Sequence, residues 1–156
     1  MGVSEKEVAK KAFTEVLSEL GFRIEEPKVS GADVYAVNGD ELYVILSDKW
    51  GEKVREEFKR FEELQGTVKR GYCAIVLYFD AQKSMLSERD LDDARREAAL
   101  HRVNLIGFEV TGKKVFPIAL SFKGAPDALV SRMMKDRLFE ASIRHHATLY
   151  RKSSEK

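Results

Sequence analysis

Two acids and a lysine gather in residues 31–50 in a pattern that could support phosphodiester chemistry. Asp33 stands near the start of one short apolar stretch. Asp48 and Lys49 close the next stretch, beyond a turn at Asn38-Gly39. Carboxylates can hold Mg²⁺ beside a phosphate, and a lysine can orient water or offset developing negative charge. The pattern therefore indicates metal-dependent cleavage of nucleic acid as the chemistry to consider.

The second acid of this pattern is missing. Residues i and i+2 of a strand share a face, so an acid two residues before a lysine points into the same cleft. In this chain Ser47 occupies that place before Lys49. A neutral hydroxyl is a poor substitute for a carboxylate that binds Mg²⁺. Asp48 faces the other way by strand alternation, unless a bulge redirects it.

The turn between the two strands decides which side chains share a face with Asp33. A two-residue turn at Asn38-Gly39 places Asp33 on the face of Asp48. A three-residue turn over 38–40 aligns Asp33 with Ser47 and the lysine instead. Asn-Gly is the commoner signature of the shorter turn, but three-residue loops containing glycine are frequent. Both registers remain open.

Hydrophobic periodicity predicts the elements that must position these residues. Ser4 and Glu7 form a capping box for a first helix, Ser87 caps a third, and the continuous apolar run 72–79 predicts a strand buried on both faces. Pro117 suits an edge strand. The order α-β-β-β-α-β-α-β-β-α predicts an α/β fold, a mixed sheet flanked by helices. The stripes expected to face inward are Val8, Ala12, Phe13, Val16, Leu17 and Leu20 in the first helix, Leu91, Ala94 and Ala98 in the third, with Leu100 as a further candidate there, and Val130, Met134, Leu138 and Ala141 in the last.

Composition bounds the class of protein. A chain of 156 residues with a net charge of +1 suits one globular domain and excludes a uniformly basic, histone-like coat. Cys73 is the sole cysteine, which excludes a disulfide framework. No apolar run reaches the roughly 20 residues of a membrane helix, and we expect no signal peptide and a cytoplasmic protein. Abundant Lys, Glu and Arg favour a thermophilic source.

The C-terminal segment is locally basic. We expect residues 1–122 to form the α/β unit and residues 123–156 a basic helical extension of the same domain. Such a segment can contact phosphates or an acidic protein surface, and a solvated helix face is the alternative. The candidate binding residues are Arg132, Lys135, Arg137, Arg144, Arg151 and Lys152.

The element order and the segment ADVYAVNGDELYVILSDKW resemble the PD-(D/E)xK, or restriction-endonuclease-like, nuclease superfamily, and archaeal Holliday-junction resolvases in particular. The likeness covers residues 4 to about 110. Asp33 matches the first acid and Lys49 the lysine, while Ser47 stands at the second acid. Ala32 replaces a frequent proline. The resemblance implies that these three matched residues form a catalytic site, active or vestigial.

If that site is active, the resemblance implies a Mg²⁺ ion held by Asp33, Asp48 and a glutamate of the first helix. Glu15 is the candidate, with Glu19 as a second. Ordinary solvated surface is the alternative for both. A site that has lost cleavage needs no metal cofactor.

Two functions from different classes follow. The first is a nuclease-fold protein with a degenerate site that binds DNA or a DNA-associated protein, similar to archaeal proteins that interact with the TATA-binding protein. The alternative is an active Mg²⁺-dependent endonuclease that cleaves DNA, including junctions, as a homodimer. A purely structural protein is a third possibility.

Overall fold

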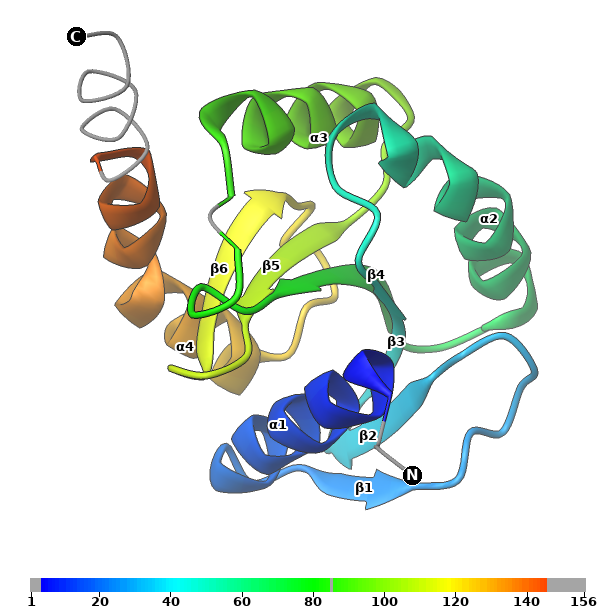
Figure 1. The fold of residues 1–156 in the computed structure, drawn as a ribbon. Helices are drawn as coiled ribbons and strands as arrows, with labels where there is room; N and C mark the ends of the chain where they lie inside the picture. Colours follow the sequence, from blue (N-terminus) through cyan, green and yellow to red (C-terminus); the bar gives the residue numbers. More distant parts are fainter. Residues whose placement is uncertain (1–3, 85, 146–156) are drawn as a thin grey trace, which may run out of the picture.

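One six-stranded mixed sheet organises residues 4–84 and 86–145, the part of the chain that this computed structural model describes (Figure 1). The strand order is β1-β2-β3-β4-β5-β6, so neighbours in sequence are neighbours in the sheet. The first three strands form an antiparallel meander, β3, β4 and β5 are parallel, and β6 is antiparallel to β5. The strands are β1 (Arg23–Glu25), β2 (Val34–Asn38), β3 (Asp40–Ser47), β4 (Tyr72–Phe79), β5 (Leu105–Glu109) and β6 (Lys114–Ala119).

Helices flank both faces of this sheet, which confirms the expected fold class and element order (Figure 1). They are α1 (Glu5–Glu19), the 3₁₀ helix η1 (Gly51–Glu57), α2 (Phe58–Thr67), α3 (Glu88–Leu100) and α4 (Asp127–Asp136). Ser4 caps α1 by accepting a hydrogen bond from the Glu7 N–H at 3.1 Å, and Ser87 caps α3 in the same way. In the described part of the chain, no helix combines the length and the apolar character needed to cross a bilayer.

Alternation along the central strands builds two cores. Leu42, Val44 and Leu46 of β3 pack on the side of α1, whereas Tyr43 and Ile45 pack on the side of α2 and α3. Every residue of β4 is buried, as the continuous apolar run predicted, because the strand lies in the centre of the sheet with helices on both sides.

The prediction for the last helix was wrong by one residue. α4 buries Leu129 and Met133, while Met134 is 41% and Leu138 is 74% exposed. α4 ends at Asp136, and the chain turns at Arg137 before it becomes helical again over residues 138–145, so the periodicity expected to reach Leu138 and Ala141 is broken. Ile143 beyond the break packs into the core on the α2 and α3 side.

The first helix also differs from its predicted stripe at one position. Val8 is 48% exposed, because it stands at the rim of a pocket and not over the sheet. The remaining predicted residues of this stripe lie in or against the core. In the third helix, the further candidate Leu100 is wrong, because it ends α3 and is 71% exposed. At the other end of the sheet, β6 is an edge strand, as Pro117 predicted.

Candidate functional site

The β2–β3 hairpin adopts the longer of the two turns considered. Val34 pairs with Val44 and Asn38 with Asp40, which leaves Gly39 at the tip with a φ of 73°. A positive φ costs glycine little, because it has no Cβ. The register aligns Asp33, the residue before β2, with the face of Ser47, as expected for a three-residue turn.

The carboxylate of Asp33 is bound by three groups of the protein itself. Oδ2 accepts a hydrogen bond of 2.8 Å from the backbone N–H of Leu46. Oδ1 lies 3.0 Å from Nη2 of Arg60 on α2 and 3.2 Å from Nζ of Lys6 on α1. Ionised partners of this kind make the stronger class of hydrogen bond. This group of four residues, hereafter the Asp33 centre, ties both helices to the hairpin.

Ser47 and Lys49 make local contacts that do not involve Asp33. The Ser47 side chain is buried, and its Oγ accepts a hydrogen bond of 3.2 Å from the Lys49 N–H. The Lys49 Nζ lies 3.6 Å from Oε2 of Glu56 on η1. The lysine of the sequence pattern is thus paired with a surface glutamate.

Glu15 lies away from the Asp33 centre. It pairs with Lys113 of the β5–β6 turn, and this partner lowers the pKa of the Glu15 carboxyl. Glu15 follows Lys6 by nine positions, which correspond to about 14 Å along the helix. Glu19, the second candidate, lies 3.8 Å from Arg132.

The residues present do not fit the Mg²⁺ ion that the resemblance implies. Mg²⁺ requires an octahedral shell with oxygen ligands. Two cations and a backbone amide already bind the Asp33 oxygens, and Ser47 offers no charge. Within residues 4–84 and 86–145, no three His, Cys, Asp or Glu side chains converge on a point where they could hold a metal.

The basic candidates of the C-terminal segment divide into three groups. Arg132 donates a hydrogen bond of 2.8 Å to the Lys113 carbonyl oxygen, and Arg144 lies 2.8 Å from Asp92 of α3, so both fasten the C-terminal region to the domain. Lys135 and Arg137 are exposed. Arg151 and Lys152 lie outside the described residues.

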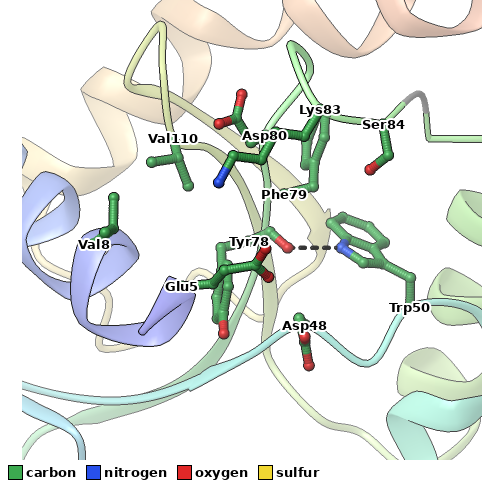
Figure 2. A pocket seen from close by; sticks show the side chains of 10 residues that line it. All are labelled: Glu5, Val8, Asp48, Trp50, Tyr78, Phe79, Asp80, Lys83, Ser84 and Val110. Atoms are coloured by element: carbon green, nitrogen blue, oxygen red, sulfur yellow. Dashed lines mark hydrogen bonds between the residues drawn. The ribbon is translucent and has the colours of Figure 1, made fainter. Parts of the chain in front are cut away.

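A pocket that sequence reasoning missed lies where β3 and β4 end, beside the first turn of α1 (Figure 2). Asp48 follows β3, Tyr78 is the last residue but one of β4, and Glu5 is the first residue of α1. We call it the Glu5–Asp48 pocket. The carboxyl ends of parallel strands commonly gather functional groups, and this rule was the available signal. Glu5, and not Glu15, is the glutamate of α1 that lines this pocket.

Tyr78 is the electrostatic centre of this pocket. Burial raises the pKa of Tyr78 to about 12, and the negative charges of Asp48, Glu5 and Asp33 add to the effect. The phenol therefore stays neutral at physiological pH. Alternation in β4 sends this ring to the α1 side, where it lies in the same core as α1.

Comparison with known proteins identifies the fold without a family. No protein-family model matches the chain, and no curated protein matches it. Among solved structures, the chain is similar to an XisH family protein from Nostoc punctiforme, with a TM-score of 0.54 and 14% sequence identity. The match covers 72% of this chain and 99% of that one. Together with the sheet topology, this likeness shows the restriction-endonuclease-like fold.

Proposed function

We propose that this chain is a nuclease-fold protein that no longer cleaves nucleic acid and acts by binding a DNA-associated protein. The observation that carries the proposal is the Asp33 centre. Lys6 and Arg60 place positive charge on the carboxylate that an active site would offer to a metal ion. Ser47 stands at the position of the second acid and has no carboxylate. The fold is retained and the means of cleavage are not.

An exposed apolar surface supports a protein as the partner. Phe122, Met134 and Leu138 are 49%, 41% and 74% exposed, and all three line a shallow groove beside β6. Arg137 stands in the same groove. Exposed apolar groups next to an arginine are typical of a protein interface, whereas duplex DNA is bound mainly through its phosphates.

The TATA-binding protein is the specific partner to which the sequence resemblance points. Direct DNA binding is the second candidate, because Lys135 and Arg137 are exposed on α4. Both versions use the same end of the molecule. They differ in which probe binds.

A cleavage assay tests the loss of activity. Labelled branched, single-stranded and duplex DNA is incubated with the protein in Mg²⁺ or Mn²⁺, beside Asp33→Ala and Lys49→Ala. We expect no cleavage by the unmodified protein. Cleavage that disappears in Lys49→Ala but persists in Lys59→Ala, an exposed lysine on α2, would sink the proposal.

A capture experiment tests the partner surface. Immobilised protein is presented with purified TATA-binding protein and, separately, with duplex DNA. Leu138→Asp should abolish protein capture, whereas Leu100→Asp, at a 71% exposed leucine on α3, should leave it intact. Capture of DNA alone, reduced by Arg137→Ala, supports the second candidate in place of the first.

A further inference from the structure

The Glu5–Asp48 pocket is small and carries excess negative charge. Its volume is about 210 Å³, below the roughly 300–1,000 Å³ of pockets for drug-sized ligands, so it suits one side-chain-sized group. Three carboxylates, those of Glu5, Asp48 and Asp80, line it against a single ammonium group, that of Lys83. Phosphates and nucleotides would be repelled.

Two of these acids have no counter-charge in the fold. In the part of the chain that the structure describes, neither Glu5 nor Asp48 makes a side-chain hydrogen bond or an ion pair. Asp80 differs, because its Oδ1 accepts hydrogen bonds from the Gln82 N–H at 3.0 Å and the Thr111 hydroxyl at 2.8 Å. Glu5 and Asp48 are therefore the groups available to a ligand.

The Tyr78 hydroxyl supplies an independent indication. Tyr78 lines the pocket and is only 7% exposed, and its hydroxyl has no hydrogen-bond partner among residues 4–84 and 86–145. Among the described residues, no fully buried side-chain oxygen or nitrogen lacks a partner, so the Tyr78 hydroxyl is the part of this side chain that is open to the pocket. Figure 2 shows the Tyr78 ring extending from β4 on the same side as the Glu5 and Asp48 side chains. An N–H donor in the pocket would satisfy this oxygen.

The remaining walls are aromatic and aliphatic. The Trp50 indole is held in place because its N–H donates a hydrogen bond of 2.9 Å to the Tyr78 carbonyl oxygen. The indole packs edge-on against the Phe79 ring, with 5.6 Å between the two ring centroids (Figure 2). Val8 and Val110 add apolar surface. Aromatic rings attract organic cations, and aliphatic walls accept their carbon stems.

We propose that this pocket binds a protonated alkylamine: the ammonium group lies among Glu5, Asp48 and the Tyr78 hydroxyl, and the stem lies against Trp50 and Val8. The chemistry favours an organic cation over a hard metal ion. Mg²⁺ and Ca²⁺ take a shell of six or more oxygens, part of it water, whereas much of this pocket is walled by hydrocarbon. No three His, Cys, Asp or Glu side chains of the described residues converge to hold a metal. A free amine and a partner's lysine side chain share this chemistry.

The proposal is independent of the groove beside β6, because the two sites share no residue. Failure at one therefore leaves the other standing.

Trp50 makes the test direct, because it is the only tryptophan in the chain and lines the pocket. Its fluorescence is followed during titration with n-pentylammonium, with Nα-acetyl-lysine N-methylamide, and with their neutral counterparts pentan-1-ol and the blocked norleucine. We expect a saturable change with the two amines only. Tighter binding of the blocked lysine identifies a partner's side chain as the natural occupant, and tighter binding of the simple amine identifies a free amine.

Three substitutions locate the binding. Asp48→Asn and Glu5→Gln should each weaken amine binding at least about tenfold, and Tyr78→Phe, which keeps the ring, about fivefold. Glu62→Gln, at an exposed glutamate of α2 outside the pocket, should change nothing. Circular dichroism confirms that each variant is folded.

Several results would overturn the proposal. They are an equal response to pentan-1-ol, an amine response unchanged in folded Asp48→Asn, and no saturable response to either amine. A saturable response to MgCl₂ without one to the amines would replace the organic cation by a metal.

Discussion

The Asp33 centre and the Glu5–Asp48 pocket lie at the same end of the sheet, but their carboxylates have different partners. In the Asp33 centre, Lys6 and Arg60 neutralise one acid, and a backbone N–H completes its hydrogen bonds. In the pocket, two acids share an environment with a neutral, buried phenol, and in the described part of the chain neither forms an ion pair, although Lys83 lines the same pocket. The first arrangement stabilises the fold. The second leaves charge unbalanced, as binding sites often do.

This contrast places the proposed ligand site at Glu5 and Asp48 and not at Asp33. The acids at this end of the sheet have different partners: Asp33 is bound by cations of the protein, whereas Glu5 and Asp48 form no ion pair in the described part of the chain. Asp33 fastens α1 and α2 to the hairpin. Glu5 and Asp48 remain for a ligand. Removing an acid from the Asp33 centre should therefore lower stability, whereas removing one from the pocket should raise it.

The largest effect is expected from Asp33→Ala. The substitution leaves the Leu46 N–H, Lys6 and Arg60 without their acceptor, so the free energy of unfolding should fall by about 2 kcal/mol. Urea denaturation measures this change. Asp92→Ala removes the partly exposed ion pair to Arg144 and should cost about 0.5 kcal/mol. Equal losses in the two variants would mean that the Asp33 centre is ordinary surface.

High pH should destabilise the protein through its buried tyrosines. Burial raises the pKa of Tyr78 and of Tyr43 to about 12, whereas an unfolded tyrosine ionises near pH 10. Above about pH 10 the unfolded state has lost protons that the folded state keeps, so stability falls as pH rises and is complete below that value. Urea midpoints measured across this range should fall less in Tyr78→Phe. An identical fall in the variant would contradict the assignment.

Asp33→Asn should give a smaller loss than the alanine variant, about 1 kcal/mol. The amide oxygen still accepts the Leu46 N–H, but the attraction to Lys6 and Arg60 is lost. Comparing the two variants by urea denaturation separates the hydrogen bond from the charge. If Asn were as costly as Ala, the charge would account for the whole effect.

The smallest effect should have the opposite sign. Asp48→Asn removes one of three carboxylates that line the pocket against the single ammonium group of Lys83, so stability should rise by a few tenths of a kcal/mol at low salt. The gain should disappear in high salt because ions screen the repulsion. Thermal melts at two ionic strengths measure it. A loss of stability would show that Asp48 has a stabilising partner.

Much of the fold could be predicted from the sequence. The apolar run 72–79, the caps at Ser4 and Ser87, and the edge position of Pro117 are local signals, and each is found in the structure. The turn length was not decided by local signals. Asn-Gly suits either turn, and the register also depends on how β3 pairs with β4.

The site was harder to predict because its partners come from distant elements. Asp33 meets Lys6 and Arg60 only after α1 and α2 have packed on opposite sides of the hairpin. No spacing in the sequence encodes that meeting. The helix glutamate was misplaced for a similar reason, since α1 presents Glu5 to the strand ends and Glu15 to Lys113.

Mn²⁺ binding measured by electron paramagnetic resonance tests the Asp33 centre most directly. The free Mn²⁺ signal is followed as protein is added, for the unmodified chain, Asp33→Asn and Asp48→Asn. Because internal cations fill the Asp33 centre, Asp33→Asn should leave the Mn²⁺ isotherm of the unmodified protein unchanged. Stoichiometric Mn²⁺ binding that Asp33→Asn abolishes would show that the carboxylate serves a metal, and the centre would then be a working nuclease site.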